Sequence, residues 1–452
     1  VWVRTVGKQD DRVVTSDKKR GVRSYFWQHD SEHVCYIQDR DGDENWHLYQ
    51  TNLKTKTTRD LTPFEGARVQ GIFRNYKFPD QALVGLNIRD ARLHDIYRLN
   101  LKNGALEMDT QNPGDVAGWT ADSQLQIRAA QITTPDGGTL IRIRDSAKAP
   151  WREFMKWGPD ESGGGLADFS EDGKTARVIT SVEANAARLL EVDVASGKRT
   201  VVAEDPNFDL GGIMAHPKTR KLEAVQFFRA RREWKVLDPA IQADMDALRK
   251  VRDGDLFIAS RDLADKSWLV GYVEDDAPVY YYAFDRATRK ATLLFSHQPK
   301  LEKYKLAEMK PIRFESRDGL QIHGYLTVPP GKEPKNLPLV LNVHGGPWGR
   351  DTWGLNPEVQ WLANRGYAVL QVNFRGSAGY GKKFLNAGDR EWAGKMHDDL
   401  IDARRWAIQQ GIADPKKLCI YGGSYGGYAT LVGVTFTPDD FTCGVDIVGP
   451  SN

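Results

Sequence analysis

The segment KKLCIYGGSYGGYATLVGVTF, residues 416–436, joins a short apolar run to a helix-like run through a glycine-rich turn. Its pattern G-x-S-x-G places Ser424 between Gly422 and Gly426. A strand followed by a helix predicts a tight turn with the serine at its apex, and the two glycines let that turn close without side-chain collisions. The hydroxyl would stand near a helix N-terminus, where negative charge is favoured. We interpret Ser424 as a nucleophile; the alternative is an ordinary serine in a glycine-rich turn.

Strands and helices alternate on both sides of this segment from about residue 306 onward. The strands are apolar on both faces, which is typical of a parallel sheet covered by helices on each side. An initial hairpin is expected at residues 310–329, with Asp318 and Gly319 at its turn. The remaining elements are expected in LPLVLNVHGG (337–346), NPEVQWLANRG (356–366), YAVLQVNFRGS (367–377), MHDDLIDARRWAIQQG (396–411) and FTCGVDIVG (441–449).

The tetrapeptide HGGP, residues 344–347, ends one of these strands. In a sheet of this kind, the loop after that strand and the residue after the nucleophile together supply the donors of an oxyanion hole. The backbone N–H groups of Gly346 and Tyr425 are therefore the predicted donors. His344 has two open interpretations, either a further donor to the oxyanion or a packed side chain that shapes the site.

A serine nucleophile needs a base, and no histidine follows Ser424 in this chain. His397 precedes it, whereas the usual order is serine, then acid, then histidine. We interpret His397 as helix packing, and Asp398 and Asp399 as N-terminal caps of that helix. Asp446 comes too early for the usual acid and is expected to be structural. No metal, cofactor or nucleotide site stands out, since no GK[ST] follows GGSYGG.

Residues 1–300 repeat a different pattern, in which a short β-type run leads through a turn to a second strand. Successive copies are separated by about 45–49 residues, the period of a four-stranded propeller blade. Stacking such blades around an axis buries their apolar faces. The pattern predicts a seven-bladed β-propeller over 1–305 and an α/β domain over 306–452; an evenly spaced β-sandwich is the alternative. The central apolar residues of the copies are Val3, Leu48, Ile96, Ile141, Leu190, Trp234 and Tyr281.

Length and composition agree with this division into two domains. The 452 residues exceed what one hydrophobic core supports. A formal net charge of +2 gives no field that would attract nucleic acid or an anionic membrane, and no apolar run approaches the roughly 18 residues of a membrane span. Three cysteines do not make a disulfide framework, so a cytoplasmic location is favoured.

These motifs together resemble the prolyl oligopeptidase family of serine peptidases, in particular its acylaminoacyl-peptidase and dipeptidyl-aminopeptidase-like bacterial branch. The resemblance rests on NVHGGPW, NFRGSAGYG, DDLIDA and YGGSYGGYAT after an apparent propeller. It implies that Ser424 forms an acyl-enzyme with short peptides, that Tyr425 and Gly346 hold the oxyanion, and that the propeller restricts access. It also implies that residues 306–452 are a partial α/β-hydrolase domain whose C-terminal part is missing, and that Arg375, in FRGS, shapes the site without reacting.

The family's catalytic Asp and His follow later strands, so the resemblance places both beyond residue 452. The expected partners are therefore a peptide substrate and the polypeptide carrying those two residues, and self-association stays open. The chain of 452 residues is expected to be nearly inactive by itself, because serine without its base loses most of its rate. Two alternatives remain: an esterase with the same triad, and a catalytically silent scaffold.

Overall fold

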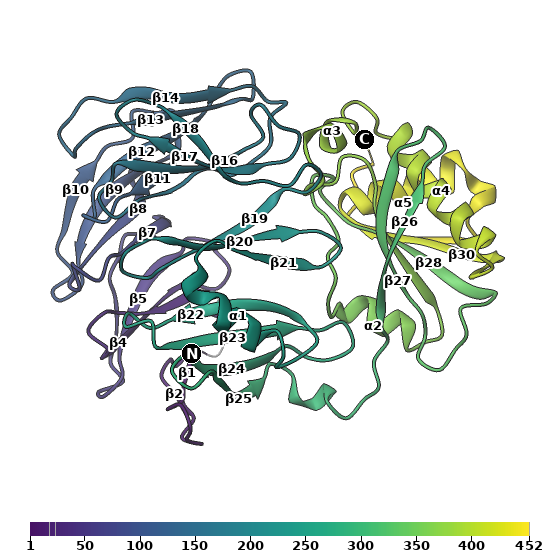
Figure 1. The fold of residues 1–452 in the computed structure, drawn as a ribbon, viewed down its shortest axis with the longest axis horizontal. Coiled ribbons are helices and arrows are strands. Elements are labelled where there is room, and N and C mark those ends of the chain that lie inside the picture. Colours follow the sequence, from purple (N-terminus) through teal and green to yellow (C-terminus); the bar gives the residue numbers. More distant parts are fainter. Residues whose placement is uncertain (18, 23, 452) are drawn as a thin grey trace. The chain divides into compact units, whose positions relative to one another are not determined.

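A computed structural model describes residues 1–17, 19–22 and 24–451. The chain divides into two compact units, and Figure 1 labels their helices and strands. The first unit comprises Val1–Pro159, Gly164–Ile179 and Leu190–Thr200. The second comprises Asp160–Gly163, Thr180–Leu189 and Val201–Asn452.

The N-terminal part of the chain consists of antiparallel sheets built from consecutive strands, as in a β-propeller. The described residues form five four-stranded sheets, one three-stranded sheet and one pair of short strands before Met309. The pair is β1 (Trp2–Val3) and β2 (Arg12–Val13). The first three four-stranded sheets are β3 (Ser24–Trp27), β4 (His33–Gln38), β5 (His47–Asn52), β6 (Thr58–Asp60); β7 (Val69–Phe73), β8 (Gln81–Asp90), β9 (Leu93–Asn100), β10 (Leu106–Thr110); and β11 (Val116–Ala121), β12 (Ile127–Thr133), β13 (Thr139–Ile143), β14 (Arg152–Trp157).

The later propeller sheets follow the same rule. The fourth sheet is β15 (Gly165–Phe169), β16 (Thr175–Thr180), β17 (Arg188–Asp193) and β18 (Arg199–Ala203). The three-stranded sheet is β19 (Leu210–Ala215), β20 (Leu222–Phe228) and β21 (Arg232–Val236), and the last is β22 (Asp255–Arg261), β23 (Ser267–Val273), β24 (Tyr280–Asp285) and β25 (Lys290–Ser296).

The sequence repeat corresponds to one position in each sheet. Six of the seven predicted apolar residues lie in the third strand of a sheet, whereas Val3 lies in the two-stranded pair. Four of the third-strand residues are buried, with Leu48, Ile96 and Ile141 fully so, and the other two are partly buried. The predicted β-propeller is thus confirmed, while the described residues show six sheets of three or four strands and the count of seven stays a prediction.

A short helical segment follows β21, at the point where the other sheets continue into a fourth strand. It consists of η1 (Pro239–Ile241) and α1 (Gln242–Leu248). Ile241, Met245 and Leu248 are fully buried in a cluster with Trp268 of the next sheet. The segment AIQADMDALRKV, residues 240–251, has a helical pattern in the sequence that predicts an interruption of the blade, and the structure shows a helix there.

The C-terminal part of the chain forms one six-stranded mixed sheet, ordered β26-β27-β29-β28-β30-β31. The strands β28, β29, β30 and β31 pair in parallel, and the predicted hairpin β26–β27 joins antiparallel. Figure 1 shows this sheet in green to yellow. The strands are β26 (Met309–Glu315), β27 (Gln321–Thr327), β28 (Leu337–Val343), β29 (Ala368–Asn373), β30 (Ala413–Gly423) and β31 (Cys443–Ile447), and η2 (Pro299–Leu301) precedes them.

Helices cover both faces of this sheet, because alternate residues of a strand point to opposite sides. On one face Val340 packs with Val359 and Leu362 of α2 (Pro357–Ala363). On the other face Leu339 and Leu341 share a core with two longer helices. These are α4 (Lys395–Gln409) and α5 (Tyr425–Phe436); the short elements α3 (Lys382–Asn386) and η3 (Pro438–Asp440) complete the domain.

Candidate active site

Ser424 occupies the turn between β30 and α5, as predicted from the sequence. Its backbone has φ 57° and ψ −119°, an unusual conformation for a residue other than glycine. The backbone N–H of Ser424 donates to the carbonyl oxygen of Ile447 at 2.9 Å, which fixes the turn against β31. The serine is exposed while its neighbours in the helix are buried. A strained, exposed serine on a rigid turn is the arrangement that a nucleophile elbow needs.

The two glycines of G-x-S-x-G are required by close backbone contacts rather than by backbone dihedrals. A Cβ atom at Gly426 would overlap the carbonyl oxygen of Val343. A Cβ atom at Gly422 would lie 2.6 Å from the same oxygen and from the backbone of Gly426. The helix α5 can therefore start directly against the end of β28 only if both positions lack side chains.

The HGGP segment lies against the nucleophile. A Cβ atom at Gly345 would be 3.4 Å from the Cβ atom of Ser424 and 4.0 Å from its Oγ. Gly346 follows with φ +132°, a backbone conformation that L side chains rarely adopt. The structure thus brings the predicted oxyanion loop and the predicted nucleophile together at the carboxyl ends of β28 and β30.

His344 is held by contacts within the protein. Its Nε2 atom lies 2.9 Å from the Ser377 hydroxyl and its Nδ1 atom 2.8 Å from the Gly345 carbonyl oxygen. Its ring stacks on Phe374, with 4.5 Å between ring centres. Because a carbonyl only accepts, Nδ1 carries a proton in this arrangement. Both nitrogens are thereby occupied, which fits a residue that shapes the loop.

The side chain of Tyr425 is buried and plays no visible part at the surface of the site. It packs on Phe374 and Trp392, with ring centres 5.2 and 4.9 Å away, and its hydroxyl donates to the Met396 sulfur. Burial raises the pKa of this phenol above its usual value. What Tyr425 can offer a ligand is its backbone N–H, since the first N–H groups of a helix have no intrahelical acceptor.

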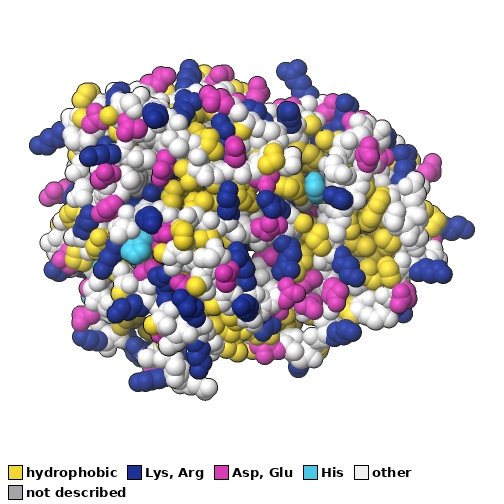
Figure 2. All heavy atoms as spheres, in the orientation of Figure 1, with side chains coloured by type: hydrophobic (Ala, Val, Ile, Leu, Met, Phe, Trp, Pro, Cys, Tyr) yellow, Lys and Arg dark blue, Asp and Glu magenta, His cyan; other side chains and the backbone are white. Residues whose placement is uncertain are grey.

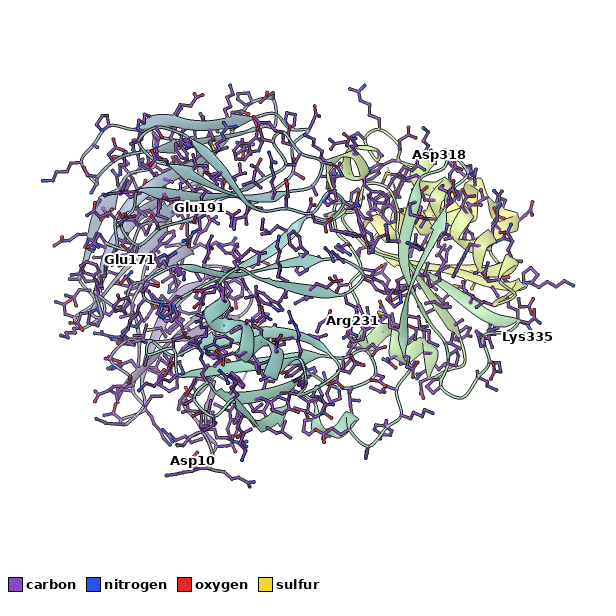
Figure 3. All side chains as sticks on the ribbon, in the orientation of Figure 1. Asp10, Glu171, Glu191, Arg231, Asp318 and Lys335 are labelled. Atoms are coloured by element: carbon purple, nitrogen blue, oxygen red, sulfur yellow. The ribbon has the colours of Figure 1, made fainter. Side chains whose placement is uncertain are left out.

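Arg375 is buried at the end of β29 and binds two carboxylates. Its guanidinium contacts Asp399 of α4 at 2.7 and 2.8 Å and Asp318 of the β26–β27 turn at 2.8 and 2.9 Å. Hydrogen bonding to Arg375 lowers the pKa of Asp318 to about 2. For Arg375 itself burial favours a lower pKa, but the bonds to both aspartates produce a net rise. Figure 3 labels Asp318 at the tip of its hairpin.

The predicted capping role of Asp398 and Asp399 is wrong. The residue before α4 is Gly394, with no side-chain cap, and both aspartates lie inside the helix. Asp399 is fully buried against Arg375, while Asp398 pairs with Arg317 at 2.6 Å. The pairing partners lie far away in the sequence, so the local pattern of two acids near a helix start could not disclose them.

His397 is placed away from the serine. Its Nε2 atom lies 3.1 Å from the Thr437 hydroxyl, just after the C-terminal end of α5. Ser424 stands before the N-terminal end of the same helix, and twelve residues at 1.5 Å each separate the two ends by about 18 Å. Burial lowers the pKa of His397. The interpretation of His397 as helix packing agrees with this position.

The face of the molecule drawn in Figure 2 carries charges of both signs, and its acidic and basic side chains are interspersed. Among the residues that the structure describes, no group of three His, Cys, Asp or Glu side chains could hold a metal ion. Within the same residues, no helix is both long enough and apolar enough to cross a bilayer.

Comparison with known proteins gives consistent matches. A family model described as "Prolyl oligopeptidase family" matches residues 353–452. The chain is 47% identical over 464 residues to dipeptidyl aminopeptidase BIII of Pseudoxanthomonas mexicana, covering 100% of this chain and 67% of that protein. It is 32% identical over 489 residues to dipeptidyl peptidase family member 6 of Caenorhabditis elegans, covering 100% and 66%. The chain thus spans about two thirds of the length of these relatives.

Solved structures share the fold at lower identity. A puromycin-hydrolyzing peptidase of Mycobacterium tuberculosis superposes with a TM-score of 0.72 at 20% identity, over 93% of this chain and 67% of that one. An acylaminoacyl peptidase of Pyrococcus horikoshii gives 0.68 at 17% identity, over 95% and 70%. Both proteins are similar to this chain in fold.

Proposed function

Because this chain belongs to the prolyl oligopeptidase family, we propose that it is part of a serine peptidase that hydrolyses short peptides. The observation that carries the proposal is the exposed, strained Ser424 with the HGGP loop against it. The name of the relative with 47% identity makes release of dipeptides from a free N-terminus the first activity to assay.

In the proposed reaction Ser424 Oγ attacks the peptide carbonyl, and the tetrahedral intermediate collapses to an acyl-enzyme that water hydrolyses. The N–H groups of Tyr425 and Gly346 donate to the oxyanion. Tyr425 supports this role because its N–H begins α5, and Gly346 because it follows Gly345, which lies against Ser424. The positive end of the helix dipole at Ser424 favours the same charge.

The base and the acid are proposed to lie on polypeptide outside these 452 residues. His344 is occupied by Ser377 and Gly345, and His397 lies about one helix length from the serine. The relatives are longer by about a third of their own length, which leaves room for both residues. Activity measurements on this protein therefore use the full-length polypeptide.

The propeller is proposed to act as a filter that admits short peptides and excludes folded proteins. Its period supports seven blades, with β1 and β2 as part of the seventh, since Val3 continues the spacing of the six third-strand residues. In this proposal the α/β domain of residues 306–452 carries the chemistry, and the propeller of residues 1–305 carries the size selection.

The variant Ser424→Ala of the full-length protein tests the proposal. We expect kcat to fall by about four orders of magnitude or more on a dipeptidyl p-nitroanilide, because the nucleophile is lost. A fluorophosphonate probe should label the wild type once and the variant not at all. Turnover of a p-nitrophenyl ester alone would instead favour an esterase. Unchanged activity in Ser424→Ala would refute the catalytic roles of Ser424, Tyr425 and Gly346 together.

A further inference from the structure

The turn between β20 and β21 is attached to the α/β domain by four consecutive residues. Both elements belong to the second compact unit, and Figure 3 labels Arg231 at this turn. The carbonyl oxygens of Phe228, Arg229 and Ala230 each accept a hydrogen bond from an α/β side chain. The guanidinium of Arg231 lies 3.8 Å above the ring of Trp353. Side chains of the α/β domain thus contact each of the four residues 228–231 of this propeller turn.

Arg350 makes two of these four contacts. Its Nη1 atom donates to Phe228 O at 3.0 Å and its Nη2 atom to Arg229 O at 3.1 Å. The same guanidinium lies 4.3 Å over the ring of Tyr380 and donates to its hydroxyl at 2.9 Å. A Cβ atom at Gly379 would collide with Nη1, so the slot holding the guanidinium is narrow.

Within the described part of the chain, the hydrogen bonds of the Arg350 side chain go to oxygens without formal charge, namely three backbone carbonyls and the phenols of Tyr380 and Tyr325. Such bonds do not neutralise a carboxylate. They fix the orientation of the Arg350 side chain relative to the turn. The rigid, planar guanidinium can donate to two carbonyl oxygens in only one geometry, whereas a lysine ammonium does not impose such a geometry. These contacts therefore point to a positioning role. The positive charge of Arg350 in addition favours the ionised forms of Asp209 and Asp351.

The backbone of Arg350 lies in the loop that carries the predicted oxyanion donor, four residues after Gly346. The other end of this stretch is tied to the sheet, where Asp351 N donates to Asn373 Oδ1 at 2.7 Å. Within the loop, between Gly346 and Asp351, the carbonyl oxygen of Gly349 accepts a hydrogen bond from Ala378 N at 2.9 Å. The loop is consequently held on one side by the sheet and on the other by the propeller turn.

We propose that Arg350 is a positioning residue for the oxyanion hole. It holds the oxyanion loop in place through its hydrogen bonds to the β20–β21 turn. The inference rests on the proposed function, since it presupposes an oxyanion at Gly346 N. An oxyanion donor acts only when it lies about 2.7–3.1 Å from the developing charge, so a shift of the loop by about half an ångström lowers kcat. Substrate binding elsewhere in the site is unaffected by that shift.

The test uses the full-length protein and the variants Arg350→Met, Arg350→Lys, Tyr325→Phe and the double variant Arg350→Met with Tyr325→Phe. The Tyr325 hydroxyl donates a hydrogen bond to Ala230 O of the same turn at 2.8 Å. We expect Arg350→Met to lower kcat and the rate of fluorophosphonate labelling by about 10- to 100-fold, with KM within about twofold. Tyr325→Phe should lower kcat by about threefold, and Arg350→Lys should restore part of the loss.

The double variant separates action through the turn from local packing on Tyr380. If both residues act through the turn, the double variant is no slower than Arg350→Met alone, since the turn is already released. Losses that multiply, or a kcat loss in Arg350→Met that appears only with a fall in thermal stability, would overturn the proposal. If Arg350→Met does not fold, Arg350→Lys and Tyr325→Phe are compared in the same way.

Arg404→Met is the control. Arg404 also donates to a backbone carbonyl, Asp440 O at 2.7 Å, and pairs with the Asp440 carboxylate at 2.9 Å, near the C-terminal end of α5. This variant should leave kcat unchanged. Absence of labelling at Ser424 in the wild type would refute the proposed function itself. Normal labelling in the wild type that Arg350→Met leaves unaltered would refute the role of Arg350 alone.

Discussion

Gly426 is the residue whose replacement should most directly disturb the nucleophile turn. A methyl group there would overlap Val343 O, the last carbonyl of β28, so α5 must move away from the sheet. We predict that Gly426→Ala lowers kcat of the full-length enzyme by at least about 100-fold, comparable to loss of an oxyanion donor. Steady-state kinetics and the rate of fluorophosphonate labelling measure the effect.

Gly158→Ala is the control for this substitution. Its added methyl group would meet nothing within 4 Å, and its backbone is not in the left-handed region. It should leave both rates unchanged. Equal labelling rates in Gly426→Ala and the wild type would show that the turn tolerates a side chain and that the glycine is not needed there.

At the scale of single residues, the sequence predicted what depends on neighbours in the chain. Ser424, Gly422 and Gly426 lie within five positions of one another, so the strand-turn-helix pattern carries their arrangement. Asp399 could not be interpreted in this way. Its partner Arg375 is 24 residues distant and reaches it only because β29 and α4 fold together. The same holds for Arg350, whose partners in the propeller turn are more than 100 residues away.

At the scale of elements, Arg375 connects three of them, namely the β26–β27 turn, the end of β29 and α4. We predict that Arg375→Met lowers the free energy of unfolding by about 3–5 kcal/mol, because it leaves the fully buried Asp399 as an uncompensated charge. Urea denaturation of the full-length protein measures the change.

The double variant Arg375→Met with Asp399→Leu should recover part of this stability, since no buried charge is then left unpaired. Arg313→Met, at an exposed position on β26, serves as the control and should change stability by less than about 1 kcal/mol. An equal loss in the single and the double variant would contradict the explanation through Asp399.

The long apolar strands and the amphipathic helices were predictable because their burial follows from their own pattern. The strands β28 and β29 read as continuous apolar runs and are buried on both faces. The five-residue helix α3 was not predicted, since one turn has too few positions to show a period. Its place in the fold is given by other segments, as Lys382 at its start binds Glu161 at 2.9 Å.

At the scale of the whole molecule, the repeat predicted the propeller but not the composition of every blade. Each third strand carries an apolar residue of the repeat, buried in β5, β9, β13 and β17 and partly buried in β21 and β24, and this residue recurs at a nearly constant spacing. The sheet β19–β21 has three strands because α1 follows where a fourth would be. The helical pattern predicted an interruption there, whereas the contacts of α1 with Trp268 depend on the next sheet.

The pH dependence of stability belongs to the same scale, because His323 of β27 packs against Phe208, which follows β18, and Tyr380, which follows β29. Burial, together with the positive charges of Arg350 and Arg313, lowers the pKa of His323 to about 4 from an ordinary value of 6.5. Below pH 6.5 the His323 side chain is therefore protonated in the unfolded chain, whereas in the folded chain it stays neutral until the pH reaches about 4. Stability from this residue is full above pH 6.5 and is lost as the pH falls from 6.5 to about 4.

We predict that the wild type loses about 3 kcal/mol more unfolding free energy between about pH 7 and about pH 4 than the variant His323→Phe, which keeps the ring stack without a titrating group. Urea denaturation of the full-length protein at both pH values gives the difference, in which all other groups cancel. Parallel pH profiles of the wild type and His323→Phe would mean that His323 accepts a proton in the folded state as readily as in the unfolded chain, and that the stack with Tyr380 opens to water.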